Sequence, residues 1–204
     1  MDLISHIYVA KLKPGTTDTQ VAGWLEAIQA LEIDGMLELT CGPDLGIREG
    51  CWDVAITADF VDAAAWHRYN DDTLHNQIRN EQAKPIVEAQ QRVQFERSRH
   101  FEVPGDIRNV TLLSLKADAP AGQGEKVAAR LRQLRCKGMH HIDAGADLGL
   151  QQGNASVGVI CDFDSPEAYA VYDADKLHNE IREQDVKPYL EVVRRVQFEL
   201  PAGP

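Results

Sequence analysis

Hydrophobic and polar residues alternate near the start of the chain, and this two-residue period predicts a β-strand over residues 6–13. A Pro-Gly pair ends the strand, and apolar residues then recur at helical spacing over residues 17–31. The pattern goes on to predict strand 36–41, strand 53–60, helix 72–83 and strand 92–96. A glycine-containing turn over residues 44–50 joins the second and third strands. The order β-α-β-β-α-β is that of a ferredoxin-like module.

The same pattern returns in the second half of the chain at one constant offset. Leu12 of the first copy corresponds to Leu115 of the second, 103 residues later. The offset relates several short identical segments: 35–36 and 138–139, 44–46 and 147–149, 59–60 and 162–163, 74–76 and 177–179, 84–85 and 187–188, and 93–96 and 196–199. In the second copy, Ser165 followed by Pro166 predicts the start of a further helix. An unbroken offset over about 90 residues indicates an internal repeat.

We therefore expect two domains, 1–98 and 108–200, joined by a polar linker over residues 99–107 with a Pro104-Gly105 break. The fold class is α+β. A four-stranded sheet with helices on one face leaves its other face uncovered, and two such sheets facing each other form a closed barrel. Most modules of this kind form the barrel by homodimerising. Here one chain supplies both halves, so we expect an internal pseudo-dimer, acting as a monomer or as a homodimer of the whole chain.

The chain carries a net charge of −11 and has a pI of about 5.0. This balance opposes binding to phosphate backbones or anionic membrane surfaces, so we expect neither nucleic acid nor membrane as a partner. No early apolar run resembles a signal peptide and no segment approaches a membrane span, which predicts a cytoplasmic protein. The four cysteines include no C-x-x-C pair, and we expect free thiols in a reducing compartment.

Several repeated residues indicate a known family. The first strand has the sequence HIYVAKLK, Tyr69 and His75 form a Y-x5-H pair, the following helix contains a proline, and the last strand reads VQFE. The second copy shows the same frame with Tyr172, His178 and Pro188. In these features the chain resembles the stress-responsive A/B barrel domain (Dabb) family over nearly its whole length. That family includes plant stress proteins and cofactor-independent enzymes, namely a polyketide cyclase of the olivetolic acid type and a hydroxynitrile lyase of ferns.

The resemblance implies roles for particular residues. In the cyclase, the tyrosine and the helix histidine of this pair act as acid/base groups, which implies the same for Tyr69 with His75 and for Tyr172 with His178. A histidine that opens the first strand of the cyclase is matched by His6, whereas the second copy has an asparagine there. A further cyclase histidine, at the start of the third strand, has no match in either copy. These departures favour a different reaction and make the second half the weaker catalytic candidate.

Tyr69 and His75 can act together only if the chain bends between them, because residues six apart on one unbroken helix point about 120° away from each other. Asn70, Asp71 and Asp72 are polar turn residues, and Asp72 can cap a new helix. His75 would then lie in the first helical turn, where the helix dipole disfavours an imidazolium and keeps the ring neutral near pH 7. A neutral imidazole suits a general base, and a phenol suits donation to a developing oxyanion.

Other side chains complete a candidate pocket in the first half. Tyr8 shares a strand face with His6 because of the two-residue period. All three tryptophans lie in the first half and would furnish an aromatic pocket that the second half lacks. The substrate-binding candidates are Tyr8, Trp24, Trp52, Trp66, Tyr172 and His178.

Two further groups of residues have alternative interpretations. His140 and His141 point to opposite faces of a strand, and with only Asp143 on the face of His141 we expect no metal site. Two cations are duplicated in the helices, and these either pair with glutamates at helical spacing or bind an anionic substrate. The duplicated cations are Arg79 with Arg182 and Lys84 with Lys187.

The leading hypothesis is an acid/base enzyme of the lyase, cyclase or isomerase type, with no cofactor, acting on a small, mostly apolar carbonyl or polyketide-like compound. Tyr69 would be the acid or oxyanion donor, His75 the base and His6 an auxiliary group, and the second half would chiefly complete the barrel. The alternative is a non-catalytic stress-responsive or ligand-binding protein in which these side chains serve folding. A third interpretation is haem binding with His178 as the axial ligand. The enzyme hypothesis predicts a cavity of several hundred Å³ beside Tyr69 and His75.

Overall fold

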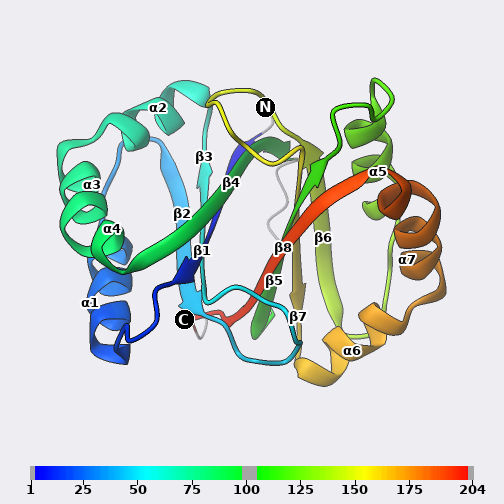
Figure 1. Cartoon of the computed structure of the whole chain (residues 1–204), viewed down its shortest axis with the longest axis horizontal. Helices are drawn as coiled ribbons and strands as arrows, with labels where there is room; N and C mark the ends of the chain where they lie inside the picture. Colours follow the sequence, from blue (N-terminus) through cyan, green and yellow to red (C-terminus); the bar gives the residue numbers. More distant parts are fainter. Residues whose placement is uncertain (1–2, 98–104, 202–204) are drawn as a thin grey trace.

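The computed structural model describes residues 3–97 and 105–201, so most of the predicted linker 99–107 lies outside the described residues. The chain forms two modules of the same topology (Figure 1). The first contains β1 (Leu3–Leu12), α1 (Asp18–Gln29), β2 (Met36–Pro43), β3 (Val54–Phe60), α2 (Ala63–Asp71), α3 (Thr73–Ile78), α4 (Lys84–Ile86) and β4 (Val87–Arg97). The second contains β5 (Ile107–Leu115), α5 (Gln123–Leu131), β6 (Met139–Ala146), β7 (Val157–Phe163), α6 (Pro166–Ala174), α7 (Lys176–Ile181) and β8 (Leu190–Glu199).

The two sheets have the strand orders β2-β3-β1-β4 and β6-β7-β5-β8, with antiparallel pairing throughout. This confirms the predicted α+β class with two ferredoxin-like modules. Several boundaries differ from the sequence-based prediction by a few residues; β1, for example, begins at Leu3 instead of residue 6, and the start of β4 differs most among the strands. β4 begins at Val87 instead of residue 92, because the helix ends directly after Pro85 and the following polar residues already pair with β1. A π-helical turn over Arg79–Ala83 connects α3 to α4.

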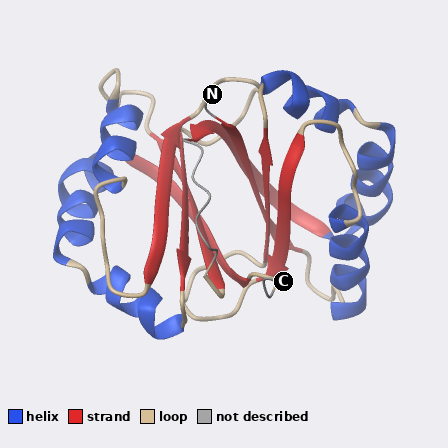
Figure 2. Ribbon diagram, turned by 180° about the vertical axis from the view of Figure 1, so that it is seen from behind, coloured by secondary structure: helices blue, strands red, loops and turns tan. Residues whose placement is uncertain are grey.

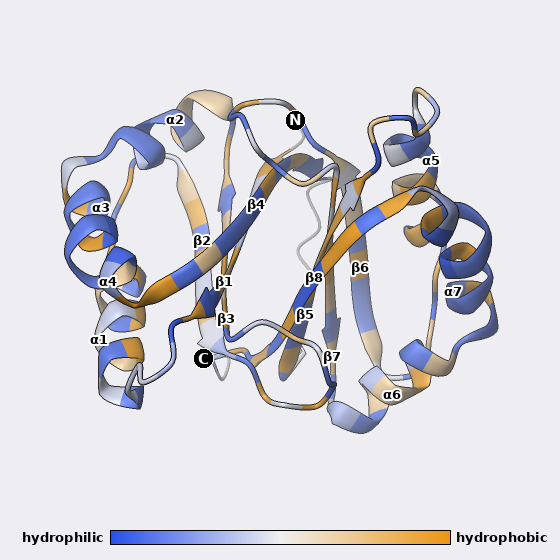
Figure 3. Ribbon diagram, in the orientation of Figure 1, coloured by the Kyte–Doolittle hydropathy of each residue, from blue (hydrophilic) through white to orange (hydrophobic). Residues whose placement is uncertain are grey.

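The two sheets face each other between two outer layers of helices (Figures 1 and 2). The helices carry many hydrophilic residues on their outer surfaces (Figure 3). Between the sheets lies a shared apolar core that includes Val93, Phe95 and Phe198. A Cβ atom on Gly145 or Gly158 would lie 2.6 or 2.7 Å from the Phe95 ring, so these glycines leave the space that the ring fills. The phenylalanine of each VQFE strand therefore packs against the opposite module.

The loops over residues 44–53 and 147–156 cross from one module to the other. Each loop runs alongside the edge strand of the opposite sheet, β8 for the first loop and β4 for the second, and donates backbone hydrogen bonds to carbonyl groups of that strand. These bonds run from Leu45 to Gln197 at 2.8 Å, Trp52 to Arg195 at 2.9 Å, Leu148 to Gln94 at 2.8 Å and Ala155 to Arg92 at 2.8 Å. They extend both sheets and join them into one barrel, which makes the chain an internal pseudo-dimer.

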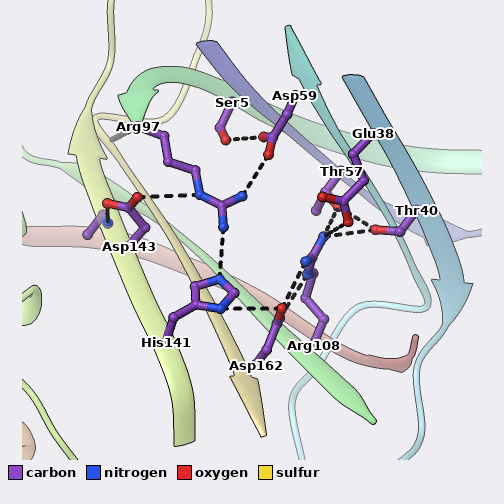
Figure 4. A network of polar contacts seen from close by, with 11 residues as sticks. Ser5, Glu38, Thr40, Thr57, Asp59, Arg97, Arg108, His141, Asp143 and Asp162 are labelled. Atoms are coloured by element: carbon purple, nitrogen blue, oxygen red, sulfur yellow. Dashed lines mark hydrogen bonds and ion pairs between the residues drawn. The ribbon is translucent and has the colours of Figure 1, made fainter. Parts of the chain in front are cut away.

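Charged side chains occupy part of the space between the sheets (Figure 4). Arg97 pairs with Asp59 of its own module at 2.7 Å and with Asp143 of the other module at 3.4 Å. Arg108 makes two hydrogen bonds to Asp162, at 2.8 and 2.9 Å, and donates to threonine hydroxyls of the first module. Both arginines are nearly buried, at 6% and 2% exposure. Since each arginine contacts both modules, the two sheets can face each other in this way only when these particular charged residues meet.

Two further predictions concern the whole chain. All four cysteines are free thiols, as the sequence predicted. Within residues 3–97 and 105–201, none of the helices has the length and apolar character needed to cross a membrane.

Candidate active site

Each module holds a cavity beside its helices. The first-module cavity has a volume of about 290 Å³, and the second-module cavity about 370 Å³. Six of the candidate side chains line the first-module cavity: His6, Tyr8, Trp24, Trp66, Tyr69 and His75. Tyr172 and His178 line the second. The first-module cavity has the location and size that the enzyme hypothesis requires.

A bend in the chain brings Tyr69 and His75 together. α2 ends at Asp71, and Asp72 adopts an extended conformation (φ −58°, ψ 137°). The Asp72 carboxylate accepts a hydrogen bond from the His75 backbone N–H at 2.8 Å, so Asp72 caps α3 as predicted. The two rings stack with their centroids 4.2 Å apart and an interplanar angle of 27°. Asn76 secures the bend, because its side-chain amide donates to the Asp72 carbonyl at 2.8 Å.

The second module repeats this geometry. Asp175 caps α7 through the His178 backbone N–H at 2.9 Å, and Asn179 donates to the Asp175 carbonyl at 2.8 Å. The Tyr172 and His178 rings stack at 4.2 Å with an interplanar angle of 23°. The repeated L-H-N segment therefore encodes the bend itself. Any functional difference between the modules must come from the residues around the stacked pair.

Both histidines of the first-module cavity have lowered pKa values. Burial lowers the pKa of His75, and the neighbouring Arg79 guanidinium lowers it further. Burial is thus the main cause of the neutral His75, in place of the helix dipole that its position in the sequence suggested. Burial, His75 and Arg92 together lower the pKa of His6 to about 3. Burial raises the pKa of Tyr69, so its phenol stays protonated beside two neutral imidazoles.

A chain of hydrogen bonds from the second module sets the tautomer of His6. The Asp147 carboxylate can only accept, so Asn154 turns its amide Nδ2 toward it at 2.8 Å. The same nitrogen donates to Oε1 of Gln94 at 2.8 Å. Gln94 therefore presents its own amide nitrogen to Nδ1 of His6, 2.8 Å away. Because Nδ1 accepts this bond, the neutral His6 ring carries its proton on Nε2.

The aromatic wall of the first-module cavity also carries polar groups. Tyr8 donates a hydrogen bond to Gln90 at 2.9 Å and packs edge-on against Trp24, with ring centroids 6.2 Å apart. Trp66 is 1% exposed, and its indole N–H has no hydrogen-bond partner among the described residues. A buried donor of this kind is normally satisfied, so this indole N–H is an exception to the usual pattern.

Trp52 lies outside both cavities. It belongs to the loop over residues 44–53, which lies alongside β8. Its ring packs against the core between the sheets, and the Arg194 guanidinium lies 4.7 Å from the ring centroid. Conversely, the first-module cavity is also lined by Gln90, Arg92 and Gln151, which were not predicted from the sequence. Gln151 comes from the second module, and no local sequence signal places it there. The glutamine in the repeated VQFE segment was a usable signal, since a polar residue recurs inside a buried strand.

The fold and the two cavities define a single-chain form of the dimeric α+β barrel. The chain belongs to the stress responsive A/B barrel domain family, whose sequence profile matches residues 4–98 and 107–201. This confirms the resemblance seen in the sequence. The comparison with curated proteins gave no match.

Solved structures show similarity to this fold. An anthrone oxidase-like protein matches with a TM-score of 0.69 and 11% identity, over 98% of this chain and 92% of that chain. A candidate monooxygenase from Fusobacterium nucleatum matches with a TM-score of 0.61 and 13% identity, over 97% and 92% of the two chains. A dimeric ferredoxin-like protein of unknown function from Thermobifida fusca matches 47% of this chain and 91% of its own, with 24% identity and a TM-score of 0.43.

Proposed function

We propose that the first-module cavity catalyses proton transfer beside the carbonyl group of a small, mostly apolar or polyketide-like compound, without a cofactor. The reaction is of the lyase, cyclase or isomerase type. The observation that carries the proposal is the stacking of Tyr69 on His75 at the wall of a cavity that also contains His6. A base, hydrogen-bond donors and space for a ligand therefore meet at one place.

His75 acts as the general base. Its imidazole, kept neutral by burial, takes a proton from the carbon beside the carbonyl, and the electron pair of that C–H bond forms an enolate. The imidazolium then returns the proton to a carbon or oxygen atom of the intermediate, so the protein ends unchanged. Lyase, cyclase and isomerase reactions at a carbonyl share this proton transfer and differ in which other bond breaks or forms.

Tyr69 and His6 stabilise the enolate oxygen. The Tyr69 phenol is protonated, and His6 carries a proton on Nε2, so each offers a hydrogen-bond donor. A donor that is fixed before negative charge develops contributes roughly 10²–10³-fold to the rate.

The second module completes the barrel and positions His6 through Asn154. Since both halves of the barrel lie in one chain, the chain acts as a monomer or as a homodimer of the whole chain. Asn109 takes the place of His6 in the second module, which supports a catalytic role for the first module alone.

Proton exchange at a carbonyl compound tests this proposal without knowledge of the natural substrate. The apolar ketone 2-tetralone is incubated in D2O, and deuterium incorporation at its α-carbon is followed by NMR. The wild-type protein is expected to accelerate incorporation above the buffer rate. Equal rates with and without protein would overturn the proposal and favour a ligand-binding role.

A further inference from the structure

We propose that the second-module cavity binds a small ligand with an apolar body and a carboxylate group, and that Arg48, supplied by the first module, holds the carboxylate. This site is separate from the proposed catalytic site, so each proposal can fail without the other. The cavity, the charges that line it and the crossing loop carry the inference.

The body of the ligand is defined by the apolar part of the wall. Leu131, Val159, Ile181, Val186 and Val193 line this cavity of about 370 Å³. At the position of His6 the second module has an asparagine, and at that of Tyr8 a threonine, so these two polar aromatic side chains are replaced here while the stacked Tyr172-His178 pair remains. Such a wall favours an aliphatic or aromatic group through burial of apolar surface.

The carboxylate is indicated by an excess of cations. Arg48, Arg182, Lys187 and Arg195 line the cavity, and Asp173 is the acidic residue among its lining side chains. Arg48 pairs with Asp173 and lies 3.5 Å from the Tyr169 hydroxyl. Arg182 lies 3.7 Å from both Asp173 and Glu183, and Lys187 pairs with Glu183 at 2.6 Å, so two carboxylates face four cations. Arg195 has no carboxylate within ion-pair distance among the described residues. In a chain of net charge −11, this local positive field selects for an anion.

Arg48 is placed by the contact between the modules. The loop over residues 44–53 donates backbone hydrogen bonds to Gln197 and Arg195 on β8, which carries Arg48 to the second-module cavity. Gln151 occupies the equivalent position at the first-module cavity, so the arginine distinguishes the two. A planar guanidinium suits a carboxylate because it donates two parallel hydrogen bonds.

Calorimetric titration of the full chain with octanoate and with its uncharged analogue octanamide tests the inference. Octanoate is expected to bind at least about tenfold more tightly than octanamide, because charge-assisted hydrogen bonds are the stronger ones. Arg48→Gln, which copies the first module, is expected to weaken octanoate binding about tenfold and leave octanamide unchanged. Arg135→Gln, an exposed arginine outside the cavity, is the matched control.

The first-module cavity also contains two arginines and could bind octanoate as well. Binding there would give a second component of the isotherm, and Arg48→Gln would leave that component unchanged. If Arg48→Gln fails to fold, as a melting curve would reveal, Arg195→Gln is expected to show the same loss. Equal octanoate affinity in the cavity variant and in Arg135→Gln would overturn the inference. Equal affinity for octanoate and octanamide in the wild-type chain would also overturn it.

Discussion

Gln94 donates a hydrogen bond to Nδ1 of His6 at 2.8 Å, and Gln197 donates the equivalent bond to Oδ1 of Asn109 at 2.6 Å. Both glutamines belong to the repeated VQFE strand, so the same bond forms in both modules. Only the acceptor differs. In the first module it is an imidazole that retains an N–H group, and in the second it is an amide. The modules thus share a frame and differ in the side chains that surround the stacked Tyr-His pair.

Asn154→Ala is expected to disturb the tautomer of His6. Without Asn154, no other residue in the described part of the chain bonds to the amide oxygen of Gln94, so this amide can turn over and the Nδ1-protonated form of His6 becomes populated. The ketone exchange rate should fall about tenfold, as is typical when a supporting residue is lost. Nitrogen NMR of the histidine side chains reports the tautomer directly. Cys51→Ala, at the equivalent position of the other module, should leave His6 unchanged; an unchanged tautomer in Asn154→Ala would contradict the account.

The free energy of unfolding is expected to decrease as the pH is lowered, because His6 is buried in its neutral form. Its folded pKa is about 3, below the ordinary value of 6.5, so the unfolded chain takes up a proton first as pH falls. The stabilisation is therefore complete above pH 6.5 and is lost between pH 6.5 and about 3. Between pH 7 and pH 5 the loss from this residue is about 2 kcal/mol.

Urea unfolding of the wild type and of His6→Asn at these two pH values isolates this contribution. The variant carries the residue that the second module has at the same position, so its fold has a precedent within the chain. The wild type should lose more unfolding free energy than the variant on acidification. Identical losses in the two proteins would contradict a neutral, buried His6.

Arg97→Met is expected to lower the free energy of unfolding by about 3–5 kcal/mol. The substitution leaves the carboxylates of Asp59 and Asp143 in a nearly buried region without this cation. Arg68→Met is the matched control, because Arg68 pairs with Asp34 at 3.6 Å on the exposed surface and such pairs contribute about 0–1 kcal/mol. Urea unfolding measures both, and equal losses would show that the network between the sheets has no special role.

The repeat made most of the fold predictable. Local signals such as the Asp72 cap and the strand alternation predicted the elements, and a constant offset required both halves to fold alike. The boundary of β4 was missed because residues beyond Pro85 are mostly polar and lack the two-residue period. Their strand conformation comes from pairing with β1, which is a tertiary contact.

The candidate site was predictable in part for the same reason. Tyr69 and His75 are close in sequence, and a single capping residue between them implied the bend. Gln151 and Arg48 reach their cavities from the opposite module, so no local pattern could assign them. Trp52 is the opposite case, a predicted pocket residue that lies outside both cavities. Its aromatic side chain suggested a pocket, but the loop over residues 44–53 places it against the core between the sheets.

Deuterium incorporation into 2-tetralone by His75→Ala and His178→Ala tests the catalytic claim most directly. The two histidines have the same cap and the same stacking partner, so the two substitutions perturb folding alike. We predict that His75→Ala loses the acceleration by at least about 100-fold while His178→Ala keeps the wild-type rate, with melting temperatures lowered equally. Equal exchange rates in the two variants would contradict the assignment of His75 as the base.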